Sequence, residues 1–265
     1  MSDYRNKLLN ILKDLKENHN IACLKAEFGE EGSSLEETAF LKELASAENL
    51  DFTVKIGGCE ALRDALNAKK IGADNIVAPM IESEYALQKF VKTIKTAYES
   101  NIPENLKLYI NIETITGYNN LENILNCKEL SEIEGIILGR TDMALSFNKT
   151  KDWVESDEMY KIAETIAALT HKFGKKIIIG GNISTTSTKF FKKLYPENID
   201  KFETRKIIFD IKSADEINIA EGITKALKFE LTWLEYKKEF FNSLTAEDKK
   251  RMESLKDRCS IPITD

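Results

Sequence analysis

The stretches KLYINIET, Lys107–Thr114, and EGIILGRTDMALS, Glu134–Ser146, decide the fold of this chain. Each contains a run of apolar, largely β-branched residues (LYINI and IIL) of the kind that forms a buried parallel strand. The segment between them has a short helical pattern. Two parallel strands joined by a helix end at the same side of a sheet. Glu113 and Asp142, which follow the two runs, are therefore expected to lie side by side at one rim.

A pair of carboxylates with open coordination positions beside it suits a hard octahedral cation such as Mg²⁺ or Mn²⁺. A single Glu or Asp at the end of a strand more often caps the following helix or is merely solvated. The matching positions of Glu113 and Asp142 at the ends of two strands favour the metal site.

The rest of the chain alternates strand and helix patterns, which predicts an α/β fold with a parallel sheet. No GxGxxG follows the first strand, so the dinucleotide-binding fingerprint is absent and a (β/α)₈ barrel of the TIM type is favoured. Seven strands are recognised, and the eighth is expected near the N-terminus or near 193–205. Besides the two opening runs, the predicted strands are Ile21–Phe28, Asp51–Ile56, Asn75–Met80, Lys175–Gly181 and Phe202–Ile211.

The 265 residues are expected to form a single barrel domain, 1–265, in which 214–265 is a helical C-terminal extension. A second helix start is expected at Thr245 within this extension. The extension is longer than one barrel needs, so we expect it to pack on a neighbouring subunit of a homo-oligomer.

Composition excludes several partners. The net charge is −6 and the pI is about 5.3, so neither nucleic acid nor an anionic membrane is an expected partner. The charged N-terminal segment is not expected to be a signal peptide, and no apolar run is long enough to span a membrane. The four cysteines form no CxxC pair, which favours reduced thiols and a cytoplasmic location. The two histidines lie away from the strand ends, so a histidine base or catalytic triad is not expected.

In a barrel of this type the active site lies at the C-terminal ends of the strands. The last strand brings Glu203, Thr204 and Arg205 to that rim. Charged side chains within apolar strands are costly unless paired. The charged strand residues are therefore expected to form one network with a metal or an anion, and they are Lys25, Glu27, Lys55 and Glu113.

Three segments resemble one known family: VAPMIESEYAL at 77–87, YINIETITGYNNLENI at 109–124, and EGIILGRTDMALS at 134–146. They are similar to the metal-dependent pyruvate aldolases and citrate lyase β-subunits of the phosphoenolpyruvate/pyruvate barrel superfamily. The likeness extends over roughly 21–182. It implies that Glu113 and Asp142 hold Mg²⁺ or Mn²⁺. It further implies that this metal chelates the carboxylate and keto oxygens of pyruvate or oxaloacetate during C–C cleavage or formation.

The chain departs from the family pattern at several positions. Asn111 stands where the family has Gln, Arg140 where it has Pro, and Lys55 where an Arg binds the substrate carboxylate. The loop KAEFGEEG lacks the family's histidine, so the base is left open among Glu27, Glu60 and Lys25.

The functional residues are therefore assigned as two sets besides the metal ligands. The catalytic set is Lys55, Glu27, Lys25 and Glu60. The substrate-binding set is Asn111, Gly139, Arg140, Thr141 and Arg205, the last of which replaces the missing cation.

The predicted function is a metal-dependent lyase or aldolase that acts on a small 2-oxo acid. Two alternatives stay open: a Schiff-base enzyme that uses Lys25 or Lys55, and a barrel that binds an anionic ligand without catalysis.

Overall fold

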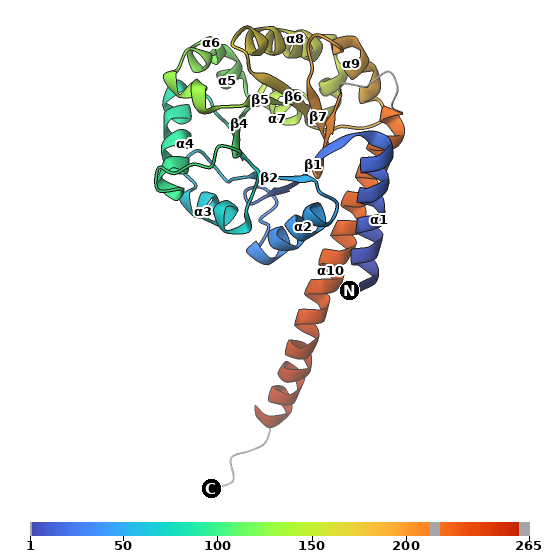
Figure 1. The fold of residues 1–265 in the computed structure, drawn as a ribbon. Coiled ribbons are helices and arrows are strands. Elements are labelled where there is room, and N and C mark those ends of the chain that lie inside the picture. The colour runs from blue at the N-terminus through green and yellow to red at the C-terminus, as the bar shows by residue number, and fades with distance from the viewer. Residues whose placement is uncertain (1, 212–217, 260–265) are drawn as a thin grey trace.

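A computed structural model describes residues 2–211 and 218–259, and it shows a closed barrel with helices around it (Figure 1). The barrel order is the order of the sequence, from β1 to β8. The strands are β1 (Ile21–Glu27), β2 (Asp51–Lys55), β3 (Asn75–Ala78), β4 (Lys107–Ile112), β5 (Gly135–Gly139), β6 (Lys176–Gly180), β7 (Lys201–Glu203) and β8 (Ile207–Asp210). The predicted α/β barrel is confirmed.

The helices lie outside the barrel and follow most of the strands. Ser34 caps the second helix in a capping box with Glu37, as the sequence predicts. The helices are α1 (Ser2–His19), α2 (Leu35–Ala47), α3 (Leu62–Ile71), α4 (Glu84–Ala97), α5 (Ile115–Asn119), α6 (Leu121–Leu125), α7 (Arg140–Ser146), α8 (Asp157–Lys172), α9 (Ser187–Leu194) and α10 (Ile219–Cys259), with 3-10 turns η1 (Lys128–Glu132) and η2 (Lys151–Glu155).

The last predicted strand, Phe202–Ile211, is in fact two strands. β7 and β8 form an antiparallel hairpin, and β8 also runs antiparallel to β1, where it closes the barrel. The polar residues 204–206 make the turn, in which Thr204 Oγ1 accepts a hydrogen bond from the Ile207 N–H at 3.2 Å. Because this predicted strand is two strands, the total is eight. β7 lies in the region around 193–205 where the eighth strand is expected. The alternative near the N-terminus is wrong, because that segment is α1.

Alternation along the strands separates the barrel interior into two levels. Four apolar side chains from β3 to β6 pack together in the lumen: Val77, Tyr109, Ile137 and Ile178. Two residues further along β4, β5 and β6 the inward positions are Asn111, Gly139 and Gly180. The apolar level closes the barrel below, and the polar level forms the floor of a cavity at the C-terminal ends.

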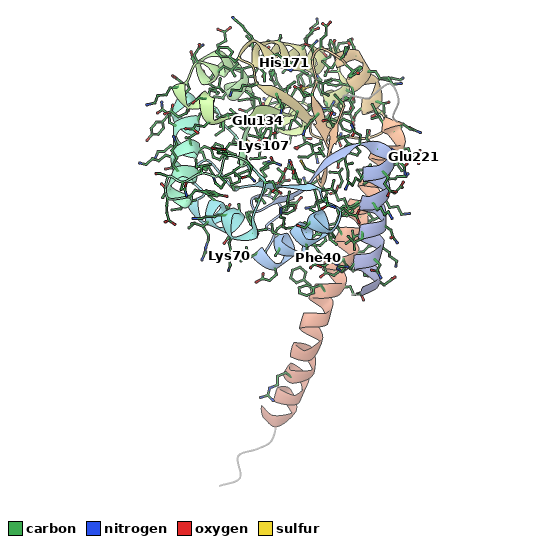
Figure 2. All side chains as sticks on the ribbon, in the orientation of Figure 1. Phe40, Lys70, Lys107, Glu134, His171 and Glu221 are labelled. Carbon is green, nitrogen blue, oxygen red and sulfur yellow. The ribbon has the colours of Figure 1, made fainter. Side chains whose placement is uncertain are left out.

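The helix α10 runs beside α1 and continues beyond the barrel (Figure 1). Its Trp233 is buried, and the ring lies 6.1 Å from that of Phe40, centroid to centroid. Phe40 is labelled in Figure 2 where α10 passes α2. The predicted helix start at Thr245 is wrong, because α10 passes through it without a break. The ends of the predicted extension, 214–217 and 260–265, lie outside the described residues. No helix among the described residues, 2–211 and 218–259, has the length and apolarity needed to cross a membrane.

The burial of Trp233 predicts that its side chain stabilises the packing of α10 against α2. Trp233→Ala should lower the free energy of unfolding by about 3 kcal/mol or more, because it leaves a cavity between α10 and α2. The control is Tyr85→Ala, since Tyr85 is 66% exposed and its removal should cost less than about 0.5 kcal/mol. The measurement is chemical denaturation, and equal costs for the two variants would contradict this packing.

Candidate active site

A cavity of about 350 Å³ opens at the C-terminal ends of the parallel strands. Both the family resemblance and the positions of the strand ends predict that the functional residues lie here. Nine of the eleven predicted site residues line it: Lys25, Glu27, Lys55, Asn111, Glu113, Gly139, Thr141, Asp142 and Arg205.

The other two predicted residues, Glu60 and Arg140, lie elsewhere. Glu60 is exposed before α3 and forms an ion pair with Lys89 at 2.6 Å. Arg140 is fully buried beneath the cavity, where its guanidinium donates to the backbone carbonyls of Gly180 at 3.2 Å and Val154 at 3.1 Å. It also lies over the ring of Phe190, 4.6 Å from its centroid. Arg140 therefore joins β6, η2 and α9, and the structure gives it no contact with the cavity.

Glu113 projects from the end of β4 into the cavity and is only 2% exposed. One oxygen accepts a hydrogen bond from the Met80 N–H at 3.0 Å, and the other accepts one from Asn111 Nδ2 at 2.8 Å. A Cβ at Gly139 on the neighbouring strand would collide with this carboxylate, so the glycine makes room for it. Burial raises the pKa of Glu113, while Lys55 and the two hydrogen bonds oppose that rise.

Asp142 reaches the same cavity from the first turn of α7, which begins directly after β5. Burial raises the pKa of Asp142, and the cation of Lys55 opposes the rise. The charge of Asp142 also adds to the rise in the pKa of Glu113 that burial causes. Both side chains line the same cavity at the ends of β4 and β5.

Two lysines from neighbouring strands balance part of this negative charge. Lys55 lies 3.5 Å from Glu27, and Lys25 donates to Glu203. Burial disfavours the ammonium form of Lys55, but the surrounding carboxylates, with Glu113 the strongest, outweigh burial and raise the pKa of Lys55. These carboxylates favour the charged form of Lys55, whereas a Schiff base needs the neutral amine.

Several cavity residues received no role from the sequence. Glu203 stands at a predicted strand end, but the hairpin that turns it inward was not recognised. Glu30 lies on the loop after β1, Lys151 begins η2, and Leu227 and Glu230 lie on α10. Sequence periodicity carries no signal for these four, because the docking of loops and of α10 at the mouth is a tertiary effect.

The charges that line the cavity do not cancel. Six carboxyl side chains face four cations, which leaves a formal charge of −2 when all are ionised. The carboxyl side chains are Glu27, Glu30, Glu113, Asp142, Glu203 and Glu230, and the cations are Lys25, Lys55, Lys151 and Arg205.

The donor set fits a divalent cation held by few protein ligands. Mg²⁺ is commonly bound by one or two carboxylates and keeps other positions for water or substrate. Glu113 and Asp142 offer two carboxylates, and the excess charge of the lining matches one divalent ion. Within the described ranges no three His, Cys, Asp or Glu side chains gather as a complete metal cage. The arrangement therefore suits an open site rather than a closed structural one.

The two arginines of the predicted binding set should differ in their effect on stability. Arg140→Met should lower the free energy of unfolding by about 3 kcal/mol or more, because it strips donors from several buried acceptors. Arg205→Met should cost less than about 1 kcal/mol, since the Arg205–Glu30 pair at 3.4 Å is largely exposed. Thermal or chemical denaturation measures both, and a small cost for Arg140→Met would contradict its buried bonding role.

Comparison with known proteins agrees with this geometry. The family model HpcH/HpaI aldolase/citrate lyase matches residues 41–183, more than half of the chain. No curated protein sequence matches significantly.

Solved structures with the same fold come from several bacteria. An HpcH/HpaI aldolase/citrate lyase family protein from Burkholderia cenocepacia J2315 superposes with a TM-score of 0.60 at 11% identity, over 89% of this chain and 90% of that one. An HpcH/HpaI aldolase from Desulfitobacterium hafniense DCB-2 gives 0.60 at 10% identity, over 92% and 89% of the two chains. The citrate synthase SbnG gives 0.56 at 14% identity, over 88% and 90%.

At such low identities these structures establish the fold alone, whereas the family model establishes descent. That family is one of lyases and aldolases, which supports an enzyme of this class. The family match over residues 41–183, in agreement with the closed barrel, shows that the chain belongs to the HpcH/HpaI aldolase/citrate lyase family.

Proposed function

We propose that this chain is a divalent-metal-dependent carbon–carbon lyase or aldolase that acts on a small 2-oxo acid of the pyruvate or oxaloacetate type, or on its adduct. The observation that carries the proposal is that the buried Glu113 lines one cavity together with Asp142, and that the lining of this cavity has an excess of two negative charges. Such an excess is costly in a confined site unless a cation offsets it.

Glu113 and Asp142 would hold the ion. A bound Mg²⁺ or Mn²⁺ supplies Lewis-acid polarisation of the keto group, which stabilises the enolate that C–C cleavage leaves. Asn111 orients the Glu113 carboxylate through its 2.8 Å hydrogen bond. The site thus holds its anionic ligands in place before substrate arrives, as electrostatic preorganisation requires.

The cations of the cavity would bind the substrate carboxylate. Lys55 is the first of these, because it lines the cavity and its Nζ lies 3.5 Å from Glu27 Oε1. It attracts a carboxylate as a point charge rather than as a two-pronged guanidinium. Thr141 and Arg205, which also line the cavity, are proposed to bind the remaining polar groups of the substrate.

The Schiff-base alternative is less well supported. Lys55 is paired with Glu27 at 3.5 Å, and Lys25 is paired with Glu203. Borohydride in the presence of pyruvate separates the two mechanisms, because only a Schiff base is trapped as a stable mass increase. The metal mechanism predicts no such adduct.

A cytoplasmic location and a homo-oligomer remain proposals. The homo-oligomer is supported by an exposed apolar stripe on α10 at heptad-like spacing: Leu227, Leu231, Leu234 and Phe241.

The double variant Leu231→Glu with Leu234→Glu should lower the sedimentation coefficient of the assembly, because it places charges in this apolar stripe. An assembly of unchanged size would contradict the use of this stripe.

Removal of either proposed metal ligand gives the direct test of function. Glu113→Gln and Asp142→Asn should each lower Mg²⁺ affinity and metal-dependent turnover of a 2-oxo acid by more than about 100-fold, because each removes a charged ligand. Calorimetry with Mg²⁺ and oxalate measures binding, and product assays measure turnover. The control is Glu60→Gln, which removes an exposed carboxylate outside the cavity and should change neither.

Retained metal-dependent activity in both ligand variants would overturn the metal mechanism. Binding of Mg²⁺ and oxalate without turnover of any 2-oxo acid would instead favour the non-catalytic alternative.

A further inference from the structure

Glu203, the last residue of β7, is a buried carboxylate of the cavity that the proposed mechanism has not used. It is 6% exposed and lines the cavity. Its Oε1 accepts a hydrogen bond from Lys25, which is itself buried. Its Oε2 is buried and has no hydrogen-bond partner among the residues that the structure describes. One oxygen of this carboxylate is held by Lys25, and the other is available to accept a proton from a ligand.

The position of Glu203 mirrors that of Glu113 across the cavity floor. Gly139 of β5 and Gly180 of β6 are register partners on adjacent strands. Glu113 leans over Gly139 from β4, and Glu203 leans over Gly180 from β7, where a Cβ would lie 3.0 Å from Glu203 Cγ. A ligand held beside Glu113 over this glycine pair would therefore have Glu203 on its other side.

The other carboxyl groups considered for the base are less suited. Glu27 Oε1 already faces Lys55 at 3.5 Å and accepts the Glu30 N–H at 3.2 Å. Glu60 lies outside the cavity and pairs with Lys89. Glu31 also pairs with a buried lysine, Lys206, but that pair does not line the cavity. Among the described residues that line the cavity, Glu203 is therefore the carboxyl group that has a buried oxygen without a hydrogen-bond partner.

We propose that Glu203 is the general base of C–C cleavage in this chain, in the place of the histidine that its loops lack. The inference rests on the proposed function and adds a residue to it. Glu203 Oε2 accepts the proton of the hydroxyl on C4 of a 4-hydroxy-2-oxo acid. The O–H electron pair then forms the carbonyl of the aldehyde or keto product, and the C3–C4 bond breaks with its electrons passing to the enolate of the 2-oxo acid. Glu203 returns the proton to C3, so protons and electrons balance without a further reactant.

In the reverse direction the same carboxylate removes a proton from the methyl group of pyruvate. This partial reaction needs no aldehyde, so it can be tested before the full substrate is known. The assay is exchange of the pyruvate methyl protons with D₂O in the presence of Mg²⁺, followed by proton NMR. Glu203→Gln should slow the exchange by about 10²- to 10⁴-fold, the range typical of a lost general base.

A second measurement separates a base from a structural or metal-binding residue. Calorimetry with Mg²⁺ and oxalate should show a much smaller loss of affinity for Glu203→Gln than for Glu113→Gln, because Glu203 is not a proposed metal ligand and glutamine keeps an oxygen that accepts from Lys25. Glu31→Gln is the matched control, since it alters a second buried glutamate–lysine pair at the same hairpin. The Glu31→Gln variant should exchange the methyl protons of pyruvate at the rate of the unaltered protein.

The outcomes distinguish the two proposals. Rapid exchange in Glu203→Gln together with lost exchange in Glu113→Gln would overturn the role of Glu203 and leave the proposed function standing. A loss of Mg²⁺ or oxalate affinity in Glu203→Gln as large as that in Glu113→Gln would likewise overturn a role as base. Absence of exchange in the unaltered protein would contradict the proposed function, and the base with it.

Discussion

The cost of burying the carboxylate of Glu113 is the constraint on which the mouth of this barrel depends. A carboxylate that is 2% exposed needs charge and hydrogen bonds to replace the water it has lost. The Met80 N–H and Asn111 Nδ2 supply two hydrogen bonds, Lys55 supplies an opposite charge, and Gly139 supplies the space. These partners come from four neighbouring strands or their ends, so the site exists only when the barrel is closed.

The hairpin at the end of the barrel gives the site its other side. Because β7 is parallel to β6 and β8 turns back, the turn at 204–206 lies at the mouth rather than at the base. That turn places Glu203 on the cavity wall and Arg205 at its edge. It also places Lys206 against Glu31, a buried pair that ties the hairpin to the loop after β1. Reversal of β8 thus replaces the last βα-loop of a regular barrel with a short charged turn.

Much of the fold and of the site follows from local signals. Apolar runs bounded by glycine or polar residues predict β1 to β6, and matching strand ends predict that Glu113 and Asp142 approach each other. The signals fail where tertiary context decides. Arg140 has the charge of a ligand-binding residue, but the buried carbonyls of Val154 and Gly180 take its donors. The hairpin escapes detection because its turn is polar and short, and Glu230 joins the cavity only through the docking of α10.

Anomalous diffraction from crystals soaked with Mn²⁺ tests the central claim most directly. One strong peak in the cavity, bonded to carboxylate oxygens of both Glu113 and Asp142, is the result that this account predicts. A peak elsewhere, or one that contacts neither of these side chains, would contradict it.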